Sequence, residues 1–124
     1  MVNLLLDNKL SLTIDIADTS EVDGSVELSI NANFLYNTCN CNYNDRLWFD
    51  EDTIKKFIKD LSIEKDCSLT DIDSDFAFEI ISDKLKIEIH KKDFYAKDNL
   101  NICFEMPFNR DFTRVKNAFE ELYL

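Results

Sequence analysis

Residues 47–61 constrain the fold of this 124-residue chain more than any other stretch. The stretch begins as a strand-like run and then places apolar residues at the i, i+3, i+4 and i+7 positions of one helix face: Ile54, Phe57, Ile58 and Leu61. The carboxylate of Asp50 can accept hydrogen bonds from the free backbone N–H groups at the start of such a helix. The stretch therefore predicts an amphipathic helix in the middle of the chain, entered directly from a strand.

Alternating apolar and polar residues predict strands on both sides of this helix. The alternation recurs in residues 10–16, 26–34, 39–43, 68–72, 76–80, 85–89 and 100–106. Pro107 ends the last strand, and Asn109 or Asp111 then caps a second helix. Its apolar stripe is Phe112, Val115, Phe119 and Leu122. Because one sheet face can bury both helices, we expect residues 1–124 to form a single α+β domain: one antiparallel sheet of about six strands with both amphipathic helices packed on one face.

The formal charge of −11 argues against nucleic acid as a partner, since neutralising phosphates requires clustered Lys and Arg. It also disfavours binding to an anionic membrane, and no stretch has the roughly 20 apolar residues of a membrane span. The start of the chain lacks the pattern of a signal peptide, so we expect the four cysteines to be reduced thiols in a cytoplasmic protein. A basic protein partner suits this charge, although the charge can also serve only to keep the protein soluble.

Three patterns imitate reactive sites, and the sequence gives each a simpler interpretation. Cys39 and Cys41 have a one-residue spacing on a predicted strand, whereas zinc sites usually pair cysteines across a turn. Asp71, Asp73 and Asp75 resemble the start of a calcium loop, but Phe76 stands where that loop needs glycine. The single histidine, His90, has no nucleophile beside it in the sequence. We therefore expect no metal, no cofactor and no enzymatic activity.

Acidic residues are concentrated directly after the first helix. Residues 66–83 contain no Lys or Arg, whereas residues 84–97 are rich in Lys. The acidic segment can steer a basic partner, or the two segments can lie on neighbouring strands and neutralise each other. On the first interpretation, the candidate partner-binding residues are Asp66, Asp71, Asp73, Asp75 and Glu79.

Asparagine alternates with apolar residues along two of the predicted strands, although asparagine is depleted in strands generally. The residues concerned are Asn31, Asn33, Asn40, Asn42 and Asn44. They predict a polar outer sheet face, which either binds a partner or only reflects a composition rich in asparagine.

The order of these patterns resembles the small immunity proteins of bacterial polymorphic-toxin systems, in particular the group related to the immunity partner of the wall-associated toxin protein. The resemblance rests on Leu47-x-Phe49-x-x-Asp52-x-x-x-x-Phe57-x-x-x-Leu61 and on a closing Phe104-x-x-x-Phe108-x-x-Asp111 before the last helix. It implies a cytoplasmic antitoxin that binds a cognate toxin domain, often a basic nuclease, through an acidic surface. A different class stays open: a small ligand-binding or structural module that forms a homodimer through a sheet edge or a polar sheet face.

Overall fold

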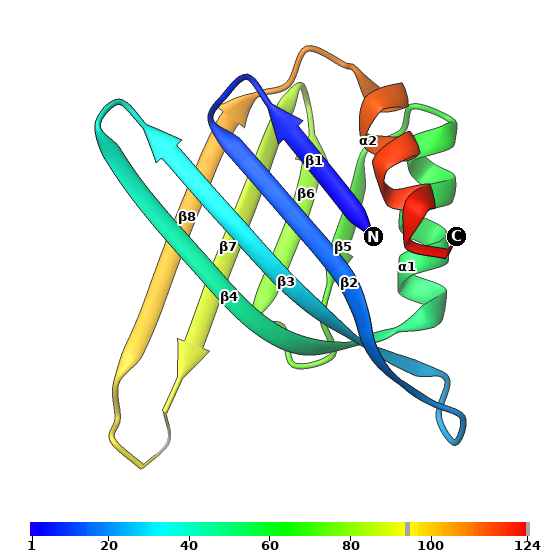
Figure 1. Cartoon of the computed structure of the whole chain (residues 1–124), viewed down its shortest axis with the longest axis vertical. Coiled ribbons are helices and arrows are strands. Elements are labelled where there is room, and N and C mark those ends of the chain that lie inside the picture. The colour runs from blue at the N-terminus through cyan, green and yellow to red at the C-terminus, as the bar shows by residue number, and fades with distance from the viewer. Residues whose placement is uncertain (94, 124) are drawn as a thin grey trace.

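The computed structural model describes residues 1–93 and 95–123, and within them the strands form two four-stranded antiparallel sheets (Figure 1). The first sheet consists of β1 (Val2–Leu6), β2 (Leu10–Ser20), β3 (Ser25–Tyr36) and β4 (Cys39–Asp50). The second consists of β5 (Cys67–Thr70), β6 (Phe76–Ile81), β7 (Lys84–Lys92) and β8 (Asn99–Pro107). Helix α1 (Glu51–Ser62) follows β4, and α2 (Phe112–Glu120) with the short 3₁₀ helix η1 (Glu121–Tyr123) follows β8.

The two halves of the chain share one topology: a meander of strands in sequence order, followed by a helix. Each helix packs on the first strand of the other half, α1 on β5 and α2 on β1, and the helices also pack on each other. Both helices consequently lie on the same side of the molecule, at the right in Figure 1. The opposite side is bounded by β4 and β8, the last strands of the two sheets.

The two sheets pack face to face, and their strands cross in the view of Figure 1. Aromatic pairs connect the inner faces: the ring centroids of Phe34 and Phe104 are 5.0 Å apart, and Phe76 lies 6.4 Å from both Tyr43 and Phe49. Inward-facing residues of both sheets and of both helices belong to one continuous hydrophobic core. The molecule is thus a β-sandwich with helices along one side.

The α+β class is confirmed, but the prediction of one sheet of about six strands is wrong. The alternation of apolar residues shows that one face of each strand is buried. It does not show what covers that face, and a second sheet can cover it just as a helix can. The structure also contains a strand that the sequence analysis does not predict, at residues 2–6, where buried Val2, Leu4 and Leu6 alternate with exposed residues. The helices therefore do not share one face of a single sheet; they close the side of the sandwich beside β1 and β5.

Both predicted helices are present, and their predicted apolar stripes face the core. In α1, Ile54, Phe57 and Leu61 are at most 1% exposed, while Ile58 is half-buried. Asp50 is the N-cap residue of α1, as predicted, but the predicted hydrogen bond to its carboxylate is absent. Instead, Glu51 N donates to the carbonyl oxygen of Gly24 at 3.1 Å.

The structure decides between the two residues predicted to cap α2. Asp111 Oδ1 accepts a hydrogen bond from Arg114 N at 3.2 Å, so Asp111 rather than Asn109 caps this helix. Phe119 of α2 then packs on Phe57 of α1 and on Phe78 of β6, with centroid distances of 4.9 and 5.7 Å. This aromatic cluster joins both helices to the second sheet.

Candidate partner-binding surface

The structure divides the five predicted partner-binding residues between different parts of the second sheet. Asp66 directly precedes β5, and its Oδ1 accepts a long hydrogen bond of 3.4 Å from Ser82 N in the β6–β7 turn. Glu79 lies within β6, opposite Lys86 of β7. At the other end of β5, the β5–β6 loop holds the remaining three, Asp71, Asp73 and Asp75. The five residues therefore do not form one surface.

Asp71 is buried and maintains the loop rather than facing a partner. Asp71 is 4% exposed, and its Oδ1 accepts a hydrogen bond from Phe76 N at 2.8 Å. Burial raises the pKa of Asp71, and the nearby charge of Asp75 adds to that rise. Because the carboxylate faces inward, Asp71 is not accessible to a partner.

Asp75 belongs to a polar network that connects the two sheets. Lys91 Nζ lies 3.5 Å from Asp75 Oδ2 and 2.7 Å from Asp45 Oδ2, and Tyr43 Oη donates to Asp45 Oδ2 at 2.7 Å. Burial acts to raise the pKa of Asp45, but hydrogen bonds from Lys91 and Tyr43 bring it below its ordinary value. The hydrogen bond to Asp45 raises the pKa of Lys91, so both partners keep their charges.

The sequence left open whether the acidic and the basic segment neutralise each other, and among the residues that the structure describes one ion pair joins the two segments. Lys91 pairs with Asp75 across the two segments. Lys84 instead pairs with Glu105 of β8 at 3.1 Å. Asp73 forms no ion pair with the described residues, so its charge stays available to a partner.

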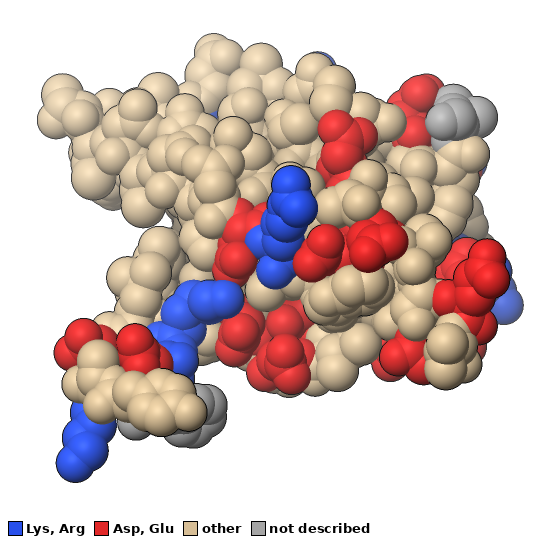
Figure 2. All heavy atoms as spheres, turned by 60° about the horizontal axis from the view of Figure 1, so that its bottom comes forward, with Lys and Arg blue, Asp and Glu red and all other residues tan. Residues whose placement is uncertain are grey.

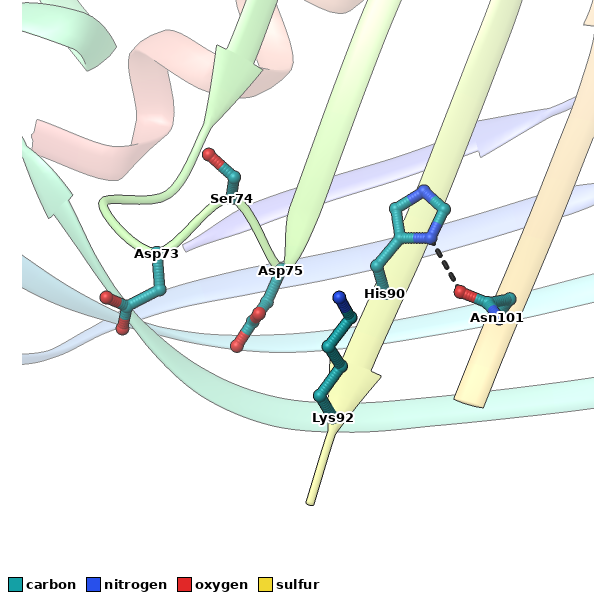
Figure 3. A pocket seen from close by; sticks show the side chains of 6 residues that line it. All are labelled: Asp73, Ser74, Asp75, His90, Lys92 and Asn101. Carbon is teal, nitrogen blue, oxygen red and sulfur yellow. Dashed lines mark hydrogen bonds between the residues drawn. The ribbon is translucent and has the colours of Figure 1, made fainter. Parts of the chain in front are cut away.

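A pocket of about 820 Å³ adjoins the loop, and its lining is Asp73, Ser74, Asp75, His90, Lys92 and Asn101 (Figure 3). His90 Nδ1 lies 2.7 Å from Asn101 Oδ1, and its Nε2 lies 3.5 Å from Glu88 Oε2. These two hydrogen bonds raise the pKa of His90. Figure 3 shows Lys92 pointing toward His90, while the carboxylate of Asp73 points away from both. The lining is polar and bears charges of both signs.

Acidic residues of three segments, this loop among them, lie at the same end of the molecule, and all of them are exposed except Glu51, which is half-buried. The residues are Glu21 and Asp23 of the β2–β3 turn, Asp50, Glu51 and Asp52 at the β4–α1 junction, and Asp73 of the β5–β6 loop. Two backbone hydrogen bonds hold the segments together, from Glu51 N to Gly24 O at 3.1 Å and from Ile72 N to Trp48 O at 2.8 Å. We call these six residues the acidic end; Figure 2 shows this part of the molecule, where acidic side chains outnumber Lys and Arg.

The acidic end also presents two exposed apolar side chains. Val22 is 97% exposed between Glu21 and Asp23, and Ile72 is 51% exposed beside Asp73. Asp23 Oδ1 accepts hydrogen bonds from Ser25 N at 3.1 Å and Ser25 Oγ at 2.6 Å, which fixes the turn below Val22. An apolar contact surrounded by charge is typical of a protein-binding surface.

Sequence reasoning identifies only Asp73 among these six residues, because no local pattern shows that the β2–β3 turn and the start of α1 lie beside the β5–β6 loop. The strand register contains part of this information: it places Ser25 opposite Asp50, and so brings the β2–β3 turn to the β4–α1 junction. That register depends on a two-residue turn at Asn37 and Thr38.

The candidate metal ligands do not assemble in the structure. Cys39 is exposed and Cys41 is half-buried, both as free thiols. In residues 1–93 and 95–123, no group of three His, Cys, Asp or Glu side chains could hold a metal ion. None of the helices described is both long and apolar enough to cross a bilayer.

The Asn-rich face lies on the outside of the first sheet, as predicted. Asn42 Nδ2 donates to Asn31 Oδ1 at 3.0 Å, and Asn44 Nδ2 donates to Asn42 Oδ1 at 2.5 Å. These hydrogen bonds connect the amides of Asn31, Asn42 and Asn44 on the outer face of β3 and β4.

No protein-family model, no curated protein and no solved structure matches this chain.

Proposed function

We propose that this chain is a non-enzymatic immunity protein that acts in the cytoplasm, where it binds and neutralises a cognate bacterial toxin domain through its acidic end. The observation that carries the proposal is the convergence of three acid-bearing segments around exposed Val22 and Ile72. Acidic side chains speed the encounter with a basic domain, and the apolar side chains supply contact area that is desolvated on binding.

The charge of the acidic end is not neutralised by the rest of the fold. Within the described residues, Glu51 forms an ion pair with Lys55 at 3.5 Å, and no other member of the acidic end forms one. An exposed pair of this kind contributes little, about 0–1 kcal/mol, so a basic partner can displace it. Asp23 stays ionised, because hydrogen bonds from Ser25 and Ser20 lower its pKa.

One further observation favours binding of a protein over binding of a small molecule, and a second fits the proposed compartment. Small-molecule sites are mostly apolar with a few polar groups, whereas the 820 Å³ pocket is lined by charged and polar side chains. All four cysteines are free, which fits a reducing compartment. The resemblance to immunity proteins supplies the class of partner.

The direct test is protection of bacteria that express the toxin. The proposal expects a large secreted protein to be encoded next to this chain, and the probe is the C-terminal domain of that protein, produced with or without the chain in the same cell. The proposal expects survival only when the chain is present, and it expects the two purified proteins to elute together. Death of the co-expressing cells, or the absence of a neighbouring toxin gene, would overturn it.

A further inference from the structure

Strand β8 is an open edge of the second sheet. Its inner neighbour is β7, and no described element pairs with its other side. The corresponding edges at the opposite side of the molecule, β1 and β5, are covered by α2 and α1. β8 is therefore the last strand of a sheet in which the other edge is protected.

The backbone groups on the free side of β8 can be identified from hydrogen bonds at both of its ends. His90 N donates to Asp75 O, away from β8, so Asn101, which lies opposite His90, also directs its N–H and C=O away from β7. At the other end of the strand, Phe108 N donates to Asp83 O, toward the β7 side. Backbone directions alternate along a strand, so Glu105 also directs its N–H and C=O away from β7. The residues that present N–H and C=O groups to the free side are Asn99, Asn101, Cys103 and Glu105.

The inner face of β8 is incompletely covered, in contrast to that of β7. Leu85, Ile87 and Ile89 of β7 are 0% exposed. On β8, Leu100 is 50% exposed, and Ile102 and Phe104 are only half-buried. Apolar side chains that point inward but stay partly exposed indicate that another strand is needed beside them.

The first sheet extends past β8 near the C-terminal end of that strand (Figure 1). Figure 1 shows the β3–β4 turn projecting beyond β8 on the side away from the helices. Tyr36 and Cys39, which face each other near this turn, lie on the same face as Phe34, whose ring contacts Phe104. Tyr36 is nevertheless 69% exposed and Cys39 is exposed. The hairpin therefore covers a place where the second sheet has no strand.

We propose that β8 of a second copy of this chain fills that place, so that two β8 strands pair antiparallel and the two second sheets become one continuous sheet. The register is centred on Ile102, which faces Ile102 of the other copy. Leu100 then lies opposite Phe104, Asn99 opposite Glu105 and Asn101 opposite Cys103. All four edge residues find partners in this register, and Pro107, which has no N–H, lies outside the pairing.

The sequence of β8 is complementary to itself in this arrangement. Apolar residues meet apolar residues on the inner face, and the single charged side chain, Glu105, meets the amide of Asn99. The two-fold axis also brings the β3–β4 hairpin of each copy toward the Leu100 end of the other β8. The other open edge, β4, is unsuited to such pairing, because inward-facing charges such as Asp45 protect edge strands.

The proposal is independent of the immunity function, and it is tested by the mass of the purified chain. Light scattering coupled to size-exclusion chromatography should give twice the 14.5 kDa of one chain at high concentration and a fall toward that mass on dilution. Cys103→Pro should abolish the dimer, because it removes an N–H that points to the free edge and no hydrogen bond to β7. Cys103→Ala keeps that N–H and is the matched control, which should remain dimeric.

Cross-linking gives a second measurement that does not depend on the folding of the proline variant. In a protein whose other cysteines are replaced by serine, the two Cys103 residues are diagonal neighbours, roughly 7–8 Å apart in an antiparallel pair. A short bismaleimide should therefore yield a covalent dimer. Three results would each overturn the proposal: a mass of one chain at every concentration, a Cys103→Pro variant that folds and still dimerises, or a Cys103-only protein that is dimeric by light scattering yet gives no covalent dimer with the bismaleimide.

Discussion

Lys91 Nζ lies 2.7 Å from Asp45 Oδ2, and this ion pair joins the inner faces of the two sheets at the end of the sandwich near the β5–β6 loop. Both residues occupy core-facing positions of their strands, where apolar residues stand elsewhere in β4 and β7. Their side chains are 23% and 38% exposed, Asp45 and Lys91 respectively, so the pair is only partly shielded from water.

Lys91→Met should lower the free energy of unfolding, because it leaves the carboxylate of Asp45 without its cation. We expect a loss of about 1–2 kcal/mol, below the 3–5 kcal/mol of a fully buried pair, since water reaches both side chains. Lys92→Met removes an exposed neighbour and should change stability by less than about 0.5 kcal/mol. Urea unfolding measures both, and equal losses would show that the Asp45 contact is not responsible.

Asp45 should also make stability fall at acidic pH. Its pKa in the folded protein lies below the ordinary value of 3.8, so the folded state binds fewer protons than the unfolded state around and below that pH. The stabilisation is complete above about pH 4–5 and is lost as the pH falls through the folded pKa. Unfolding free energies measured across this range should therefore fall more steeply for the wild type than for Asp45→Asn.

Asp71 should behave with the opposite sign, because burial raises its pKa above 3.8 in the folded protein. Its charged form is unfavourable above the folded pKa, and this penalty disappears as the pH falls toward 3.8. Asp71→Asn keeps an oxygen that can accept from Phe76 N and removes the charge. Chemical unfolding should find this variant at least as stable as the wild type at pH 7, with the difference shrinking on acidification; a growing difference would contradict the assignment.

The four cysteines should react with alkylating reagents in a fixed order. Cys39 and Cys103 are exposed, Cys41 is half-buried, and Cys67 is buried. Burial, helped by the charges of Asp60 and Asp66, raises the pKa of Cys67 to about 12, so almost none of it is thiolate at neutral pH. Mass spectrometry after iodoacetamide treatment should find Cys67 modified only when the protein is unfolded, and rapid modification of native Cys67 would disagree with its place in the core.

Phe119 should be the most sensitive position of α2, since it joins Phe57 and Phe78 and is 0% exposed. Phe119→Ala should cost about 3–5 kcal/mol, as is usual for a buried aromatic residue. Phe104→Ala, at a half-buried ring on the open side of the sandwich, should cost clearly less. Thermal or urea unfolding measures both losses of stability. A larger loss for Phe104→Ala would mean that the open side of the sandwich contributes more to stability than the contacts of the helices do.

The sequence could predict both helices and most strands, because the periods of 3.6 and 2 residues record which face of each element is buried. It could not predict what covers that face. Phe34 and Phe76 alternate as strand residues covered by a helix would, yet they contact aromatic rings of the opposite sheet. A strand pattern is therefore compatible with one sheet or two.

The candidate site could be predicted only in part for a related reason. Asp73 is exposed and available, whereas Asp71, two residues away, is buried against Phe76 N. The spacing of acids along a loop does not show which carboxylates face inward. Glu21 joins Asp73 in the acidic end through the packing of separate segments around the β4–α1 junction, and no local pattern records that contact.

The most direct measurement is the association rate between the purified chain and the toxin domain, with charge reversals at two places. Glu21→Lys and Asp73→Lys together reverse two exposed charges of the acidic end, whereas Asp66→Lys and Glu64→Lys together make the same change in net charge near the start of β5. Binding through the acidic end predicts an association rate at least about tenfold slower for the first double variant, with a weaker salt dependence, and a nearly unchanged rate for the second. Equal effects of the two double variants, or a larger effect of the second, would contradict it.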